Sequence, residues 1–113
     1  MNIKILKTLS SVFLFIFLSN ELLADQGITS DEILIGMHTD ISGPASMIGK
    51  QSVDGANMRF SEFNENGGAF GRTIKFIVED HQYTVPRAVQ AANKLLRKDK
   101  VAFMLGSLGK PMN

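Results

Sequence analysis

The chain has 113 residues, which is enough for at most one small domain. Its 12 basic and 11 acidic side chains nearly balance, which argues against nucleic acid as a main partner because phosphate binding needs a clustered positive surface. No residue is cysteine, so disulfides, thiolate metal sites, cysteine nucleophiles and a bacterial lipoprotein anchor are excluded.

Residues 1–24 have the pattern of a secretory signal peptide. Lys4 and Lys7 make a positive start, and an uncharged apolar stretch over residues 12–18 follows them. With its extension backward to Leu9, that stretch is about half of the roughly 20 residues that a helix needs to span a bilayer. We expect cleavage near Ala24 and export to the periplasm, with an uncleaved membrane anchor as the alternative.

The first half of the mature chain predicts a strand, a loop and a helix. Residues 33–37 are apolar at nearly every position, as in a strand that is covered on both faces of a parallel sheet. Residues 42–46 have the composition of a loop, and a helix is predicted from about Lys50 to Glu65. Its apolar face is formed by Val53, Ala56, Phe60 and Phe63.

The second half repeats this alternation. A strand is predicted over residues 73–78, and after a loop Thr84 is a suitable N-cap for a helix that runs to about Lys98. The apolar run at residues 101–105 predicts a third strand. The apolar face of the second helix is formed by Ala88, Ala91, Ala92, Leu95 and Leu96.

The predicted order is β-α-β-α-β, which is typical of an α/β fold with a partial doubly wound parallel sheet and helices on its faces. The chain stops just after a strand of the buried type, where the pattern calls for another helix. The third strand would also be an open apolar edge, which complete domains usually cover. We therefore expect residues 25–113 to be an incomplete domain.

Loops at the carboxyl ends of the strands are the candidate binding site, since ligands of open α/β sheets bind there. The loops after the first and third predicted strands are rich in Gly, Ser and Pro, and such loops expose backbone N–H groups that suit a small anion such as a carboxylate. Ser42, Ser46 and Ser107 are the candidate hydroxyls, although a serine taken alone is more often a turn or cap residue than a ligand contact.

Catalytic and cofactor motifs are missing. No G-x-G-x-x-G follows the first strand, and neither His38 nor His81 has a partner at metal-binding spacing, so both are interpreted as polar loop or strand-end residues. Glu79 and Asp80 are adjacent, so a strand would point them in opposite directions. We expect neither an enzyme nor a cofactor.

Several segments, in order, resemble one known family. Ile33 to Gly36, Ser42 to Ala45, Asn64 to Arg72 and Gly106 to Gly109 are similar to the N-terminal lobe of type I periplasmic binding proteins, whose familiar members are the leucine/isoleucine/valine-binding proteins of ABC transporters. The family fold has two α/β lobes that close on a small ligand. The resemblance implies that residues 25–113 are the start of the first lobe.

The resemblance also implies roles for individual residues. Ser107 matches the serine that binds the ligand carboxylate, and Leu108 follows it in the same loop. Ile48 matches a residue that packs on the ligand and is often aromatic in the family. Ile48, together with Lys110 where many relatives have threonine, leaves the identity of the ligand open.

These features predict a capture protein of an ABC importer that binds a branched-chain amino acid or a related small carboxylate or amide and delivers it to a membrane permease. A periplasmic sensor built on the same lobe is one alternative, and a gene fragment without function is another. A doubly wound enzyme is disfavoured by the missing motifs.

Overall fold

The computed structural model describes residues 25–112, so the predicted signal peptide lies outside the described residues. Two long parallel strands form the centre of the fold, and each begins within one residue of the predicted position. Both extend further than predicted, by about two residues. The elements, in chain order, are β1 (Glu32–Thr39), α2 (Ser46–Glu65), β2 (Thr73–Asp80), α3 (Val85–Asn93), the π-helical turn η2 (Lys94–Lys98), β3 (Phe103–Met104) and the 3-10 turn η3 (Lys110–Met112).

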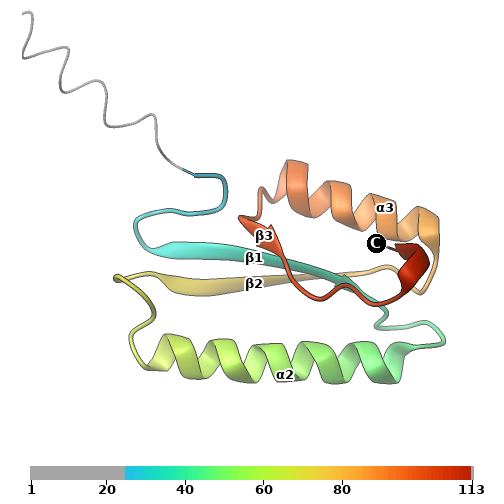
Figure 1. The fold of residues 1–113 in the computed structure, drawn as a ribbon, viewed down its shortest axis with the longest axis horizontal. Helices are drawn as coiled ribbons and strands as arrows, with labels where there is room; N and C mark the ends of the chain where they lie inside the picture. The colour runs from blue at the N-terminus through green and yellow to red at the C-terminus, as the bar shows by residue number, and fades with distance from the viewer. Residues whose placement is uncertain (1–24, 113) are drawn as a thin grey trace, which may run out of the picture.

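The three strands form one parallel sheet in the order β2-β1-β3, with α2 and α3 on opposite faces (Figure 1). The pairing of β1 with β2 runs from Glu32↔Thr73 to Thr39↔Asp80. Because β1 is central and covered on both faces, its residues from Ile35 onward are buried, which explains why its sequence is apolar rather than alternating. The predicted α/β fold class is therefore confirmed.

Helix α2 packs on the β2 side of the sheet. The rings of Phe60 and Phe76 meet edge to face, with centroids 5.1 Å apart. The predicted apolar stripe of α2 is half-buried, whereas its charged residues are exposed. Gly67 and Gly68 end the helix with positive φ angles of 92° and 66°, as their composition indicated.

Helix α3 covers the other face. Its buried side chains are Ala88 and Ala91, and Leu95 of η2 continues the buried stripe. A Cβ added to Gly36 of β1 would lie 3.1 Å from the Leu95 side chain, so the missing side chain lets the helix approach the strand. Leu96 was expected on this buried face but is 45% exposed. It lies in η2, where the backbone is π-helical, so the α-helical spacing that predicted the stripe does not hold there.

Two other predictions need correction. Thr84 lies at the N-cap position of α3, but its hydroxyl donates to the carbonyl of His81 instead of accepting a helix amide. Strand β3 is shorter than the predicted residues 101–105, because ladder pairing is confined to Phe103 and Met104. The backbone amides of Ala102 and Leu105 nevertheless donate to β1, so the segment follows β1 beyond the ladder.

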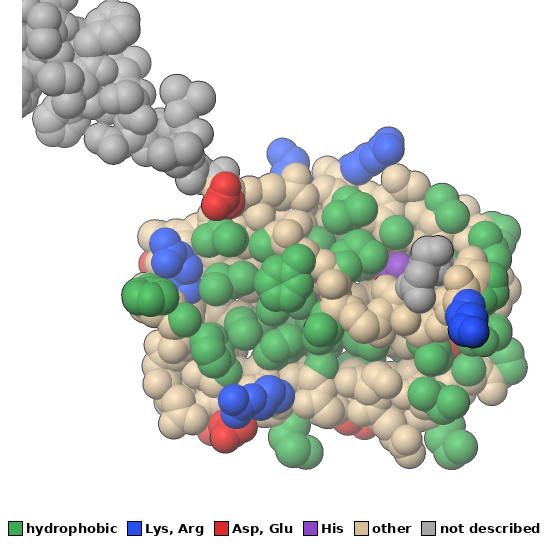
Figure 2. Space-filling model, viewed as in Figure 1, with side chains coloured by type: hydrophobic (Ala, Val, Ile, Leu, Met, Phe, Trp, Pro, Cys, Tyr) green, Lys and Arg blue, Asp and Glu red, His purple; other side chains and the backbone are tan. Residues whose placement is uncertain are grey.

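The outer side of β3 is open and apolar. Phe103 is 50% exposed and Leu105 is 37% exposed. Figure 2 shows hydrophobic side chains gathered on the face above β1 and β3. We refer to Phe103, Leu105 and the outer backbone of β3 as the β3 edge. It fits the expectation that the third strand is an uncovered edge.

Candidate functional site

The connections after β1 and β3 leave the sheet toward opposite faces. The loop after β1 leads to α2, whereas η3, which follows β3, lies beside α3 (Figure 1). This divergence between neighbouring strands is a topological switch point, where open α/β sheets form their ligand crevice. The carboxyl ends of β1 and β3, where Ser42 and Ser107 follow, are therefore the candidate site.

Asp40 organises the loop after β1 from within. Its buried carboxylate accepts hydrogen bonds from the backbone N–H of Gly43 at 2.5 Å and of Ala45 at 2.7 Å. A Cβ on Gly43 would lie 2.7 Å from Asp40 Oδ1, so glycine is required for this approach. The expectation that this loop offers open amides to an anion is thus wrong for these two amides, because the protein's own carboxylate occupies them.

Asp80 ties the end of β2 to the same loop. Its Oδ1 accepts from the backbone N–H of Ile41 at 2.9 Å and of Gln82 at 3.0 Å, and its Oδ2 accepts from the hydroxyl of Ser42 at 2.5 Å. Burial opposes ionisation of Asp80, but the hydrogen bonds from Ser42, Ile41 and Gln82 outweigh it and lower the pKa to about 2. Ser42, a predicted site residue, is therefore bound to a permanent anion at neutral pH.

His81 connects the next residue of the chain to the loop after β3. Its ring is fully buried. Nδ1 accepts from the backbone N–H of Tyr83 at 3.0 Å, so Nδ1 of the neutral ring carries no proton and Nε2 carries it. Nε2 lies 3.1 Å from the carbonyl oxygen of Leu108 and donates to it. The adjacent residues Asp80 and His81 thereby link the loops after all three strands.

His38 of β1 lies against His81 under this junction. The two rings meet edge to face with centroids 5.5 Å apart. His38 is buried, and its Nδ1 has no hydrogen-bond partner among the described residues. Burial lowers the pKa of His38, so the ring is neutral at physiological pH. Both histidines lie at strand ends as predicted, but they are buried rather than exposed to solvent.

Three backbone amides of the loop after β3 are open within the part of the chain that the structure describes. Within residues 25–112 the backbone N–H groups of Gly106, Leu108 and Gly109 have no hydrogen-bond partner. Gly106 and Gly109 have positive φ angles of 46° and 99°, which glycine adopts without strain. Ser107 and Leu108 between them are half-buried. Open amides beside a serine hydroxyl are suitable donors for a small anion.

The other two predicted site residues lie in the first turn of α2. Ser46 is the first residue of the helix, and its backbone N–H donates to the carbonyl of Gly43. The Ile48 side chain is 53% exposed. Helix α2 begins at Ser46 rather than Lys50, and this places both residues in a helical turn at the carboxyl end of β1.

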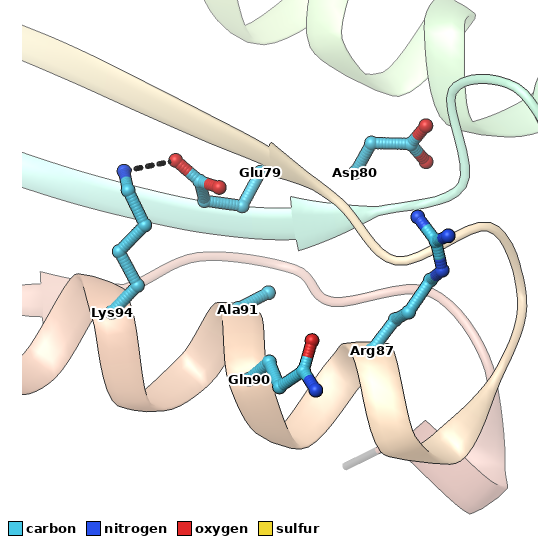
Figure 3. Close-up of a pocket in the computed structure, with 6 residues that line it drawn as sticks. All are labelled: Glu79, Asp80, Arg87, Gln90, Ala91 and Lys94. Carbon is cyan, nitrogen blue, oxygen red and sulfur yellow. Dashed lines mark hydrogen bonds and ion pairs between the residues drawn. The ribbon is translucent and has the colours of Figure 1, made fainter.

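A separate hollow of about 200 Å³ lies between the end of β2 and α3 (Figure 3). Lys94 forms an ion pair across it with Glu79, and a second one at 3.0 Å with Asp99, which directly follows η2. These hydrogen bonds, first to Glu79 and then to Asp99, raise the pKa of Lys94. Glu79 thus pairs with the first residue of η2 while Asp80 bonds the loop after β1, as expected for adjacent strand residues. None of the predicted site residues lines the hollow.

Sequence reasoning did not single out Asp40, and it weighed Asp80 and His81 only as a catalytic pair member and a metal ligand, without finding their structural roles. Asp at the first and Gly at the fourth position is a composition signal for a β-turn, and it could have identified Asp40. No comparable local signal marks Asp80 or His81, since their partners are 38 and 27 residues away. The described residues contain no group of three potential metal ligands, and none of their helices is long and apolar enough to cross a bilayer.

The sequence pattern of the periplasmic binding protein family matches residues 32–112. This range includes every strand and helix described above. The chain therefore belongs to the periplasmic binding protein family, and the resemblance found in the sequence is confirmed. Members of this family are binding proteins rather than enzymes.

Individual relatives carry names of the leucine/isoleucine/valine-binding type. The chain is 31% identical over 75 residues to the Leu/Ile/Val-binding protein BraC3 of Rhizobium johnstonii, covering 66% of this chain and 20% of that protein. It is 29% identical over 83 residues to the leucine-, isoleucine-, valine-, threonine- and alanine-binding protein of Pseudomonas aeruginosa, covering 74% and 22% respectively.

Solved structures of substrate-binding proteins are similar to this chain in fold. A fatty acid ABC transporter substrate-binding protein from Thermomonospora curvata matches with a TM-score of 0.72 and 30% identity, over 83% of this chain and 24% of that one. The substrate-binding protein LivJ of a branched-chain amino acid transporter from Streptococcus pneumoniae, in complex with isoleucine, matches with a TM-score of 0.65 and 26% identity, over 67% and 22%. The chain thus spans between 20 and 24% of the length of these relatives.

Proposed function

We propose that this protein contributes the first ligand-binding loops of an ABC importer's substrate-binding component. It would capture a small carboxylate in the periplasm, with a branched-chain amino acid as the first candidate, and deliver it to a membrane permease. Residues 1–24 would direct export and residues 25–113 would form the start of the N-terminal lobe. Membership of the periplasmic binding protein family supports this class of function.

The observation that carries the proposal is the open set of amides in the loop after β3. The N–H groups of Gly106, Leu108 and Gly109 have no partner within the described residues, and they lie at the end of a strand beside the switch point. Charge-assisted hydrogen bonds from such donors suit a carboxylate. Ser107 would add its hydroxyl, while Leu108, Ser42, Ser46 and Ile48 would line the neighbouring surface.

A carboxylate is also the group that the relatives' ligands share. One relative is named for fatty acids and another was solved with isoleucine. These ligands differ in size and in their amino group, but both carry a carboxylate. Recognition of that group is consequently the part of binding that these N-terminal loops are best suited to provide.

Titration calorimetry on the full gene product tests the proposal. The panel contains isoleucine, leucine, leucinamide, octanoate and 3-methylbutylamine, which is leucine without its carboxylate. Binding of at least one carboxylate, with no heat from 3-methylbutylamine, is the expected result. Binding of the amine as strongly as of leucine would contradict a carboxylate site. No binding heat from any compound of the panel would contradict the whole proposal.

A further inference from the structure

His81 lies outside the loops that would touch the ligand, yet it contacts one of them directly. Its buried Nε2 donates to the carbonyl oxygen of Leu108, in the loop whose amides are open. Its Nδ1 is held by the backbone N–H of Tyr83. Both ring nitrogens are therefore engaged, and the Tyr83 bond fixes which of them can donate to the loop.

The Leu108 carbonyl determines where the next amide points. In a planar trans peptide the C=O of one residue and the N–H of the next point in opposite directions. The described residues contain no cis peptide, so anchoring the Leu108 carbonyl on the buried ring turns the Gly109 N–H away from it. That N–H is one of the three open donors of the loop.

The ring itself is held from several sides. Tyr83 and the preceding Gln82 both have left-handed backbones, with φ angles of 56° and 50°, which are uncommon for residues other than glycine. The carboxylate of Asp80 accepts the Gln82 amide, as His81 accepts that of Tyr83, so two side chains stabilise this strained turn. His38 packs against the ring.

We infer that His81 is a positioning residue for the carboxylate site: in its Nε2–H tautomer it holds the Leu108 carbonyl and so orients the Gly109 N–H toward the ligand. This inference rests on the proposed function, because it assigns His81 a task at the same loop. It identifies a residue from the loop after β2 that controls donors in the loop after β3.

A matched pair of variants separates the two bonds of His81. His81→Gln places an amide near the position of Nε2 and keeps a donor for Leu108. His81→Asn places an oxygen near Nδ1, so it keeps the acceptor for Tyr83 but is too short to reach Leu108. The two variants differ by one methylene, so a difference between them reports the bond to Leu108 rather than the loss of the ring.

NMR on the isotope-labelled full gene product tests the hydrogen bond from His81 to the Leu108 carbonyl without any ligand. In the wild type, the ¹⁵N shifts of His81 should show a protonated Nε2 and an unprotonated Nδ1. The Gly109 amide should shift and exchange faster with solvent in His81→Asn and stay near its wild-type position in His81→Gln. An Nδ1–H tautomer in the wild type would overturn the inference even if neither variant folds.

Titrations of the wild type and both variants with isoleucine, and in parallel with octanoate, then test whether the bond from His81 to Leu108 affects binding. The affinity should fall about tenfold in His81→Asn and by less than about threefold in His81→Gln, as expected for losing one oriented hydrogen bond. Equal affinities in the two variants, together with an unmoved Gly109 amide, would refute the role of His81. If the wild type binds neither probe, the proposed function fails. The His81 tautomer and the Gly109 amide still show whether His81 holds the Leu108 carbonyl and orients the Gly109 N–H.

Discussion

Gly49, in the first turn of α2, lies so close to the end of β1 that a Cβ on it would meet the carbonyl oxygen of Asp40 at 1.8 Å. No side-chain movement can relieve such a clash, because the atom in the way belongs to the backbone. The same Cβ would lie 3.0 Å from the Thr39 hydroxyl. The missing side chain of Gly49 therefore determines how closely the first turn of α2 approaches the candidate site.

Gly49→Ala should lower the free energy of unfolding by about 1–3 kcal/mol, the usual cost of overpacking a close contact. Gly55, in the same helix, has open space around its Cα and is the matched control. Gly55→Ala should raise stability by about 0.5–1 kcal/mol because alanine favours the helix. Urea denaturation of both variants measures the difference, and a stabilised Gly49→Ala would show that the turn does not approach β1 this closely.

Asp80→Asn tests the network that holds the loop after β1. The pKa of Asp80, about 2, lies below its ordinary value of 3.8, so its charged form stabilises the fold above pH 4, and this contribution is lost as the pH falls toward 2. The side chain is partly exposed, so solvent screening reduces this stabilisation. Asp80→Asn should therefore lower the free energy of unfolding by about 1 kcal/mol at pH 7. Asp54→Asn, at an exposed position of α2, is the control. The wild type and Asp80→Asn should converge in stability near pH 2, and a constant gap at all pH values would contradict this account.

The β-α-β-α-β order, the central strand and the stripe of α2 could all be predicted from apolar periodicity, because burial decides those positions. The hydrogen-bonding partners of Asp80 and His81 could not be predicted in this way. Asp80 meets Ser42 only because Thr39 and Asp80 are register partners, and His81 reaches Leu108 across the end of β1. Such contacts depend on strand order, which local sequence patterns do not encode. The open amides at Gly106 and Gly109 fit the glycine-rich composition, whereas the occupied amides at Gly43 and Ala45 depend on a carboxylate that composition alone did not reveal.

His38→Leu should flatten the pH dependence of stability near neutrality. The folded-state pKa of His38 is below its ordinary value of 6.5, so the wild type loses stability as the pH falls below 6.5, where the unfolded chain binds a proton that the folded chain refuses. Leucine has no such proton and leaves no buried nitrogen without a partner. Thermal melts between pH 5 and pH 8, compared at each pH, measure the change. Identical slopes in the two proteins would show that His38 is not the group responsible.

Phe103→Lys tests the β3 edge. An apolar strand with unpaired backbone groups favours association between chains, and a charge at its edge opposes this. Sedimentation velocity of residues 25–113, without the apolar segment that precedes them, should show concentration-dependent association that Phe103→Lys weakens. Phe70 is 96% exposed in a turn away from β3, so Phe70→Lys should associate like the wild type. A monomeric wild type would contradict the prediction.

Ser107→Ala tests the hydroxyl that would assist the open amides. Loss of one hydrogen bond to a charged ligand group should weaken the binding of isoleucine about tenfold or more. The matched control is Ser52→Ala, because the Ser52 hydroxyl bonds the Ile48 carbonyl within α2. Calorimetry measures both variants, and unchanged binding in Ser107→Ala would remove Ser107 from the site.

The central place of β1 limits how this gene can change in length. Adding or removing one residue between Glu32 and Thr39 would exchange the two faces of every position that follows, so His38 would move toward α2 and Thr39 toward α3. Insertions and deletions should accordingly be tolerated in the turn around Phe70, at the opposite end of the sheet, and rejected in the strand. Natural length variation among close orthologues would then leave this strand untouched while the far turn grows or shrinks.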